Sequence, residues 1–283
     1  MIEYESLLHS NSTFMDELEA SSARVIRSGR YVLGQEVSLF EAEFAKFVGV
    51  KHCIGVGNGL DALILSIVAL NLPQGSDILV ASNTYIATIL AIIRAGHYPV
   101  LVEPDPKTFN IDVSAIEKLI SPKTKVIIPV HLFGQAADME EIMALAKKYN
   151  LMVVDDCARS VLSTYKGHLV GTLADISVFS FESKKHLSAG GEGGMIVSNN
   201  EELAVKARKF AGIGYKHMTA DAGRTHLAID TVQDPSYKRF DTIGVNYRMN
   251  DIQATLGLSQ VKKLSSFIKK RNLIAKRYIK ELK

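Results

Sequence analysis

Short apolar runs alternate with segments of helical period over most of the chain, and this alternation constrains the fold more than any other feature. Strands are expected where runs rich in Val and Ile occur, at 52–56, 77–81, 99–102, 125–130, 151–155, 176–181 and 194–198. Helices are expected at 60–72, 84–95, 113–120, 139–149 and 201–210. This order predicts an α/β fold whose mostly parallel sheet is covered by helices on both faces.

The composition provides material for a large core and points away from nucleic acid. Of the 283 residues, 47% are apolar, which is enough for one big domain or two ordinary ones. The net charge is only +3, and the basic residues are spread along the chain, apart from a cluster after residue 260 that suits the polar face of a helix. We therefore expect no nucleic-acid partner.

No segment is expected to direct the chain into a membrane. Residues 1–19 are mostly polar and acidic, unlike a signal peptide. The least polar run, 78–93, is interrupted by polar residues and is shorter than the roughly 20 residues that span a bilayer. Cys53 and Cys157 lack the spacing of a metal or redox pair and suit core thiols in a reducing compartment. The sequence predicts a cytoplasmic protein with no metal site.

Two segments depart from the alternation. Residues 212–240 are polar, include Pro235 and show no clear period, which predicts a long excursion of the kind that is usually functional or mobile. From Asn250 onward the apolar residues suit one long amphipathic helix; they are Ile252, Leu256, Leu258, Val261, Leu264, Phe267, Ile268 and Leu273.

Ligands of such sheets bind beyond the carboxyl ends of the strands, and three notable segments lie there. The first is the glycine-rich turn 55–61, which either binds a phosphate through helix N–H groups or is purely structural. It does not match a dinucleotide fingerprint, because Leu60 stands where the third glycine belongs. The second is the pair Asp155 and Asp156, of which either carboxylate binds a ligand or caps the following turn.

The third segment, 180–195, places Lys184 and Lys185 between an expected strand and four glycines. The pair is either part of a solvated turn or includes a reactive amine, because a partly desolvated lysine loses its proton more readily and can then attack a carbonyl. An anion-binding turn, a carboxylate and a lysine, in this order, are the three anchors of pyridoxal phosphate. They bind its phosphate, its ring nitrogen and its aldehyde.

Longer motifs resemble the DegT/DnrJ/EryC1/StrS family of sugar aminotransferases, which are fold-type I pyridoxal phosphate enzymes. The resemblance runs from about Ser28 to the end and is carried by 28–34 with Phe40-Glu41, 57–63, 84–88, 129–135, Asp156, 180–194 and 244–249. It implies a large domain over residues 1–250, with an N-terminal helical segment and a mostly parallel seven-stranded sheet between helices. Residues 251–283 would be a long helix leading into a small C-terminal domain that is largely absent from this chain.

The resemblance also implies roles for single residues. The family's spacing of serine, phenylalanine, lysine and leucine selects Lys185 rather than Lys184 as the residue that forms the Schiff base with the cofactor. The other residues with implied cofactor contacts are Asp156 for the ring nitrogen, Tyr85 for the ring face, and Ser180, Gly59 and Leu60 for the phosphate.

Further implied contacts concern the partner subunit and the substrate. Family members share each active site across a homodimer, and Asn246 matches the asparagine that reaches the phosphate in the partner subunit. Arg248 either binds an anionic substrate or the donor's carboxylate, or forms a surface ion pair. Arg159 departs from the glutamine or histidine that relatives usually have there, and its permanent charge would alter the cofactor's electronics or bind an anionic substrate.

The resemblance thus implies a transaminase that moves an amino group, from glutamate, to a keto group of a nucleotide-linked deoxysugar for surface polysaccharide or glycoconjugate synthesis. Lys185 would be the general acid and base. One alternative is a sugar dehydratase on the same fold, although relatives of that kind replace the lysine with histidine. The others are a non-catalytic or regulatory protein of this fold, and a nicotinamide-nucleotide-binding domain.

Overall fold

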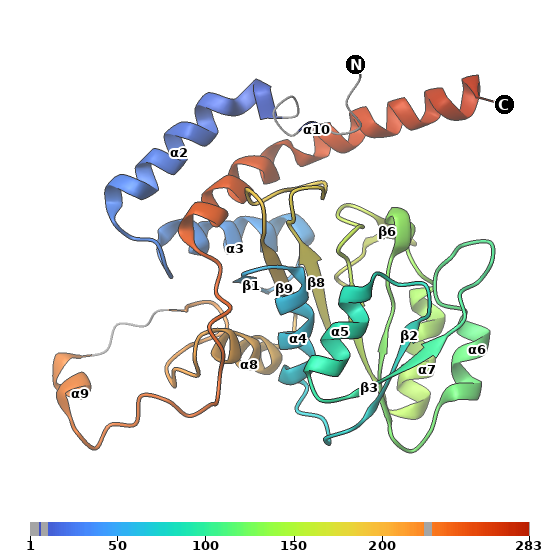
Figure 1. The fold of residues 1–283 in the computed structure, drawn as a ribbon, viewed down its shortest axis with the longest axis horizontal. Coiled ribbons are helices and arrows are strands. Elements are labelled where there is room, and N and C mark those ends of the chain that lie inside the picture. The colour runs from blue at the N-terminus through green and yellow to red at the C-terminus, as the bar shows by residue number, and fades with distance from the viewer. Residues whose placement is uncertain (1–5, 7–10, 224–227, 283) are drawn as a thin grey trace.

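A sheet of seven strands lies at the centre of the computed structural model, which describes residues 6, 11–223 and 228–282 (Figure 1). The strands follow the spatial order β1-β9-β8-β5-β4-β2-β3, and all neighbours are parallel except β9, which is antiparallel to both β1 and β8. Their bounds are β1 His52–Val56, β2 Asp77–Ala81, β3 Tyr98–Val102, β4 Thr124–Ile128, β5 Met152–Asp156, β8 Ile176–Ser180 and β9 Gly194–Ser198. The predicted mostly parallel seven-stranded sheet is confirmed.

Helices connect the strands as the sequence predicted, with ends that differ from the expected ones by three residues or fewer. They are α4 Gly59–Ala69, α5 Ile86–Arg94, α6 Val113–Leu119, α7 Met139–Tyr149 and α8 Glu201–Ala211. The N-terminal helical segment consists of η1 Ser12–Phe14, α2 Met15–Ser28 and α3 Gln35–Val48. Short elements without a sequence prediction are η2 Leu132–Gly134, the hairpin of β6 Thr164–Tyr165 and β7 His168–Leu169, and α9 Ile229–Gln233.

The two faces of the sheet are covered by different helices because side chains alternate along each strand. In β8, Ile176 and Val178 join the core under α4, α5 and α8, whereas Phe179 joins the opposite core. There α3 and α10 (Asp251–Glu281) cover one end of the sheet, with the ring of Phe44 packed against Phe179 and that of Phe40 against Phe181. The other end is covered by α6 and α7. No helix in the described part of the chain is both long and apolar enough to cross a membrane.

The long C-terminal helix begins at the predicted position and is tied to α3. Asn250 caps α10 in a capping box with Gln253, and the carboxylate of Asp251 accepts hydrogen bonds from the N–H groups of Gly34 and Glu36 at the start of α3. A Cβ atom at Gly34 would lie 2.5 Å from this carboxylate, so only glycine allows the contact. The domain boundary at residue 250 stays a prediction.

The predicted excursion at 212–240 folds partly back on itself. Tyr215 pairs with Phe240 in an antiparallel bridge, and their rings lie 4.7 Å apart. The segment carries α9, which lies apart from the sheet (Figure 1), while residues 224–227 fall outside the described residues. The excursion is therefore a long loop whose two ends are held together by the contact between Tyr215 and Phe240.

A buried ion pair joins three of these elements. Arg208 of α8 binds both carboxylate oxygens of Glu41 of α3, at 3.0 and 2.9 Å, and also donates to the carbonyl oxygens of Cys53 and Ala220. Glu41 in turn accepts from the N–H of Gly55 in β1 at 2.7 Å. Each charge is desolvated, and each is compensated by several partners.

Replacing Arg208 with methionine should lower the free energy of unfolding by about 3–5 kcal/mol, because the carboxylate of Glu41 would stay buried without its cation. Urea denaturation followed by circular dichroism measures the change. The matched control is Arg277→Met, which breaks the exposed pair with Glu281 and should cost less than about 1 kcal/mol. Equal effects of the two substitutions would contradict the role given to the buried pair.

Candidate active site

The three sequence segments singled out as ligand sites meet at one edge of the sheet. Strands β1, β8 and β5 all point the same way, because β1 and β8 are each antiparallel to β9, and β8 is parallel to β5. Their carboxyl ends therefore lie on one edge, with the start of β9 between β1 and β8. This edge is where ligands of parallel sheets bind.

The glycine-rich turn after β1 packs directly against the neighbouring strands. A Cβ atom at Gly59 would lie 2.7 Å from Cβ and 2.9 Å from Oγ of Ser180, and a Cβ atom at Gly194 would lie 2.3 Å from the carbonyl oxygen of Asn58. The two glycines thus allow the N-terminus of α4 to approach the end of β8. The N–H groups of Gly59 and Leu60, in the first turn of α4, have no partner within a helix and are available to an anion.

Two residues of this turn were not predicted as functional. Asn58 caps α4 by accepting a hydrogen bond from the N–H of Asp61 at 2.8 Å, and its amide donates to the Asp61 carboxylate at 3.0 Å. Burial, with a smaller effect of the Glu192 charge, raises the pKa of Asp61 to about 6. An asparagine three residues before an acid, at the start of an apolar helix, is the sequence signal that could have identified this cap.

The structure gives the two adjacent aspartates different surroundings. Asp156 is buried at the end of β5, where its carboxylate accepts hydrogen bonds from Oγ1 of Thr88 at 2.9 Å and from the N–H of Ala158 at 3.1 Å. Burial raises the pKa of Asp156, and these two donors act in the opposite direction. Asp155 has a different set of partners, led by His131. Thr88 was missed, because the pairing joins residues far apart in the sequence.

The structure also distinguishes the two lysines. Lys184 is exposed, whereas Lys185 is half-buried in the turn that follows β8. Burial lowers the pKa of Lys185, and the positive charge of Arg159 lowers it further. The charges of three carboxylates oppose this effect; they belong to Glu182, Asp156 and Glu192. A lysine with a lowered pKa has a larger neutral fraction, which is the form that reacts with carbonyls.

The remaining predicted residues lie around this edge. Tyr85 precedes α5, and its side chain is 75% exposed. Arg248 pairs with Val56 of β1 in an antiparallel bridge, and its Nε donates to the side-chain oxygen of Asn246 at 3.0 Å. Asn246 itself is exposed and pairs with Gly212 through the backbone in another antiparallel bridge, while its side-chain oxygen accepts the hydrogen bond from Arg248. Arg159 is exposed and forms no salt bridge with any described residue.

Comparisons with known proteins agree with this geometry. The model of the DegT/DnrJ/EryC1/StrS aminotransferase family matches residues 13–283. The chain is 41% identical to the dTDP-3-amino-3,6-dideoxy-alpha-D-galactopyranose transaminase of Aneurinibacillus thermoaerophilus, with 100% of this chain and 73% of that protein covered. It is 39% identical to the GDP-perosamine synthase of Caulobacter vibrioides, with 88% of this chain and 62% of that protein covered.

A solved crystal structure also superposes on this chain. It is the crystal structure of DesV of S. venezuelae in complex with a ketimine intermediate, with a TM-score of 0.87 and 33% identity. The superposition covers 99% of this chain and 70% of DesV. The chain therefore spans between 62% and 73% of the length of these three relatives.

The raised pKa of Asp61 makes its contribution to stability depend on pH. Since the folded-state pKa lies above the unfolded value of about 3.9, folding favours the protonated form, and the wild type should lose stability relative to Asp61→Asn as the pH rises from about 4 through about 6. Urea unfolding of both proteins over this range measures the difference.

Asp105→Asn is the control for this experiment. Hydrogen bonds from the N–H groups of Lys107 and Thr108 lower the pKa of Asp105, so its contribution should be present above the unfolded pKa and be lost as the pH falls. The two variants should therefore show opposite trends. A pH-independent difference for Asp61→Asn would show that its carboxyl group has an ordinary pKa.

Proposed function

The chain belongs to the DegT/DnrJ/EryC1/StrS aminotransferase family, and we propose that it is a pyridoxal phosphate-dependent transaminase acting on nucleotide-linked sugars. The amino group would come from glutamate and be transferred to a keto group of a nucleotide-linked deoxysugar, for surface polysaccharide or glycoconjugate synthesis. The observation that carries the proposal is the meeting of Lys185, Asp156 and the N-terminus of α4 at one edge of the sheet. The names of the relatives support the substrate class.

The residues at this edge fit pyridoxal phosphate. The close contact of Gly59 with Ser180 places the hydroxyl group of this serine beside the free N–H groups of the first turn of α4, and this set of donors suits the phosphate. The buried carboxylate of Asp156 keeps acceptor capacity beyond its two donors and suits a protonated ring nitrogen. The half-buried amine of Lys185 suits the aldehyde.

Each side chain then has a defined task in transamination. The bound cofactor would supply an aldehyde that accepts the amino group and a ring that withdraws electrons. Lys185 would hold the cofactor until the donor arrives, and its Nζ would then remove and return the proton at the reacting carbon. Asp156 would hold the proton of the ring nitrogen, and Thr88 and Ala158 would orient its carboxylate.

The residues around the edge complete the proposed site. Tyr85 would stack on the cofactor ring, and Asn246 would bind the phosphate in the partner subunit, so the enzyme would be a homodimer with shared sites. Arg159 and Arg248 are the candidates for an anionic group of substrate or donor. The site and the relatives' names suit a cytoplasmic enzyme that uses nucleotide sugars, and the Asn58-Gly59-Leu60 turn resembles the branch that aminates C3.

Replacing Lys185 with alanine should abolish covalent cofactor binding and lower transamination by about 10²-fold or more, because the proton at the reacting carbon loses its acceptor. Borohydride reduction of the pyridoxal phosphate-loaded protein, followed by peptide mass spectrometry, locates the adduct. Release of 2-oxoglutarate from glutamate, with a panel of keto-sugar nucleotides, measures turnover and identifies the acceptor. Lys184→Ala is the matched control and should keep both properties. An adduct on any other residue would refute the assignment.

Sharing of the site between subunits can be tested by complementation. Lys185→Ala and Asn246→Ala should each reduce activity when purified alone. In a co-expressed heterodimer, isolated through two different tags, one of the two sites carries both substitutions and the other carries none, so part of the activity should return. If the heterodimer is no more active than its parents, Asn246 acts within its own subunit or has no role.

A further inference from the structure

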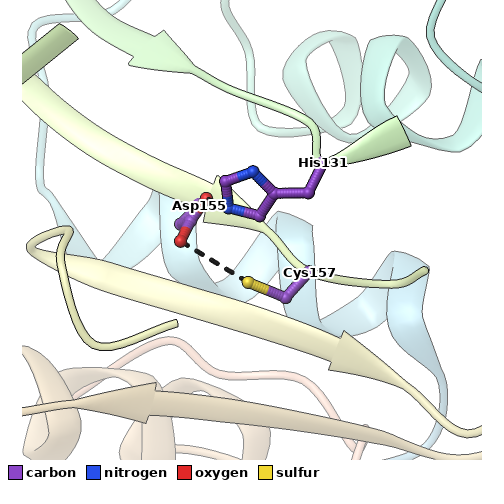
Figure 2. A group of neighbouring side chains, drawn as sticks. All are labelled: His131, Asp155 and Cys157. Carbon is purple, nitrogen blue, oxygen red and sulfur yellow. Dashed lines mark hydrogen bonds and ion pairs between the residues drawn. The ribbon is translucent and has the colours of Figure 1, made fainter. Parts of the chain in front are cut away.

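A cluster of three buried side chains is formed by His131, Asp155 and Cys157 (Figure 2), and the last two residues flank Asp156 in the sequence. The carboxylate of Asp155 accepts from the N–H of Gly171 at 3.0 Å and from the thiol of Cys157 at 3.5 Å. Its other oxygen lies 2.6 Å from Nε2 of His131, and neither of these two atoms has another polar partner in the described part of the chain. The atoms that could bind a metal ion are thus paired with one another, His131 with Asp155 and Cys157 with Asp155. The cluster is therefore a polar network and not a metal site.

The charge of this cluster follows from its hydrogen bonds. The N–H of Ala137 donates to Nδ1 of His131 at 3.0 Å, so this nitrogen is an acceptor and the ring proton must be on Nε2, facing Asp155. A second ring proton has no place, and the imidazole is neutral. Burial, reinforced by the nearby Asp155 charge, raises the pKa of Cys157, so its thiol stays neutral as well. The negative charge of Asp155 is therefore solvated by neutral donors and is not cancelled by a cation.

Backbone contacts fix the position of the charged Asp155 carboxylate relative to Asp156. The two aspartates are neighbours in β5, and the backbone N–H of His131 donates to the carbonyl oxygen of Asp156 at 3.3 Å, while the N–H of Asp156 donates to Pro129 at 2.9 Å. Lys185 interacts with Asp156 electrostatically, and the two groups that donate hydrogen bonds to the Asp156 carboxylate, from Thr88 and Ala158, are neutral. A fixed negative charge on the preceding residue, away from water, makes the carboxylate of Asp156 a stronger proton acceptor, and the charge of Asp155 raises the pKa of Asp156 accordingly.

We propose that His131 and Asp155 are positioning residues that keep a negative charge beside Asp156, so that Asp156 holds the proton of the cofactor's ring nitrogen more tightly. The proposal rests on the proposed function, because it requires pyridoxal phosphate at Asp156. His131 contributes by orienting the Asp155 carboxylate without neutralising it. Both side chains are fully buried, and neither would touch the cofactor.

The test compares pyridoxal phosphate with 1-deazapyridoxal phosphate, in which carbon replaces the ring nitrogen. Asp155→Asn keeps the size of the side chain and removes its charge. Its affinity for pyridoxal phosphate, measured by absorbance titration of the apoprotein, should fall by about tenfold, which corresponds to one pKa unit. Its affinity for the deaza compound should be unchanged, because that compound has no ring proton for Asp156 to hold.

Two further variants distinguish the effect of the Asp155 charge from a structural effect of the cluster. Cys157→Ala removes a member of the cluster but not the charge, and His131→Gln keeps a donor toward Asp155 and an acceptor for Ala137. Both should bind the two compounds in the wild-type ratio. An equal loss of affinity for both compounds in Asp155→Asn would overturn the proposal, since it would show a purely structural role.

A measurement on the wild type keeps the proposal testable if Asp155→Asn does not fold. The ring nitrogen of ¹⁵N-labelled pyridoxal phosphate, followed by NMR in the loaded protein, should stay protonated throughout the neutral pH range. Loss of the proton within that range would overturn the proposal. If the wild type binds neither pyridoxal phosphate nor the deaza compound, the proposed function itself fails. This outcome differs from the one that overturns only the present proposal, in which the wild type binds both compounds and Asp155→Asn loses affinity for both equally.

Discussion

The site depends on a close approach of backbones that only glycine permits. The carbonyl oxygen of Asn58 occupies the position that a Cβ atom of Gly194 would need, and Gly59 lies against the side chain of Ser180. Any side chain at these two glycines would push the start of α4 away from β8 and β9. The free N–H groups of the helix would then no longer lie beside the serine hydroxyl and the lysine-bearing turn.

Much of the fold was predictable because the sheet is buried on both faces. Interior strands such as β2 and β9 contain short runs of consecutive apolar residues, 78–81 and 195–197, and the bounds of both strands were predicted to the residue. The direction of β9 was not predictable, since an apolar run has the same pattern whether it pairs parallel or antiparallel. The β6–β7 hairpin is too short to produce a periodic signal.

The parts of the candidate site that lie within one continuous sequence motif were predictable. The turn after β1 and the lysine-bearing turn after β8 are each continuous in sequence, and the choice of Lys185 over Lys184 agrees with their different exposure. The contacts of Thr88 with Asp156 and of His131 with Asp155 join residues 68 and 24 positions apart, respectively, in different elements. No local pattern encodes such pairs, so the residues alone left Asp155 and Asp156 undistinguished, and Asp156 was selected by the family resemblance.

The reversed direction of β9 has a consequence for how the lysine moves. Because β8 ends and β9 begins at the same edge, residues 181–193 form a short closed loop, fastened by backbone hydrogen bonds of Phe181 with Gly193 and Ala189, and of Ser183 with Gly191. The main chain around Lys185 therefore has little freedom to travel. In the proposed transamination, Nζ of Lys185 would therefore change its position by torsion about the side-chain bonds and not by movement of the main chain.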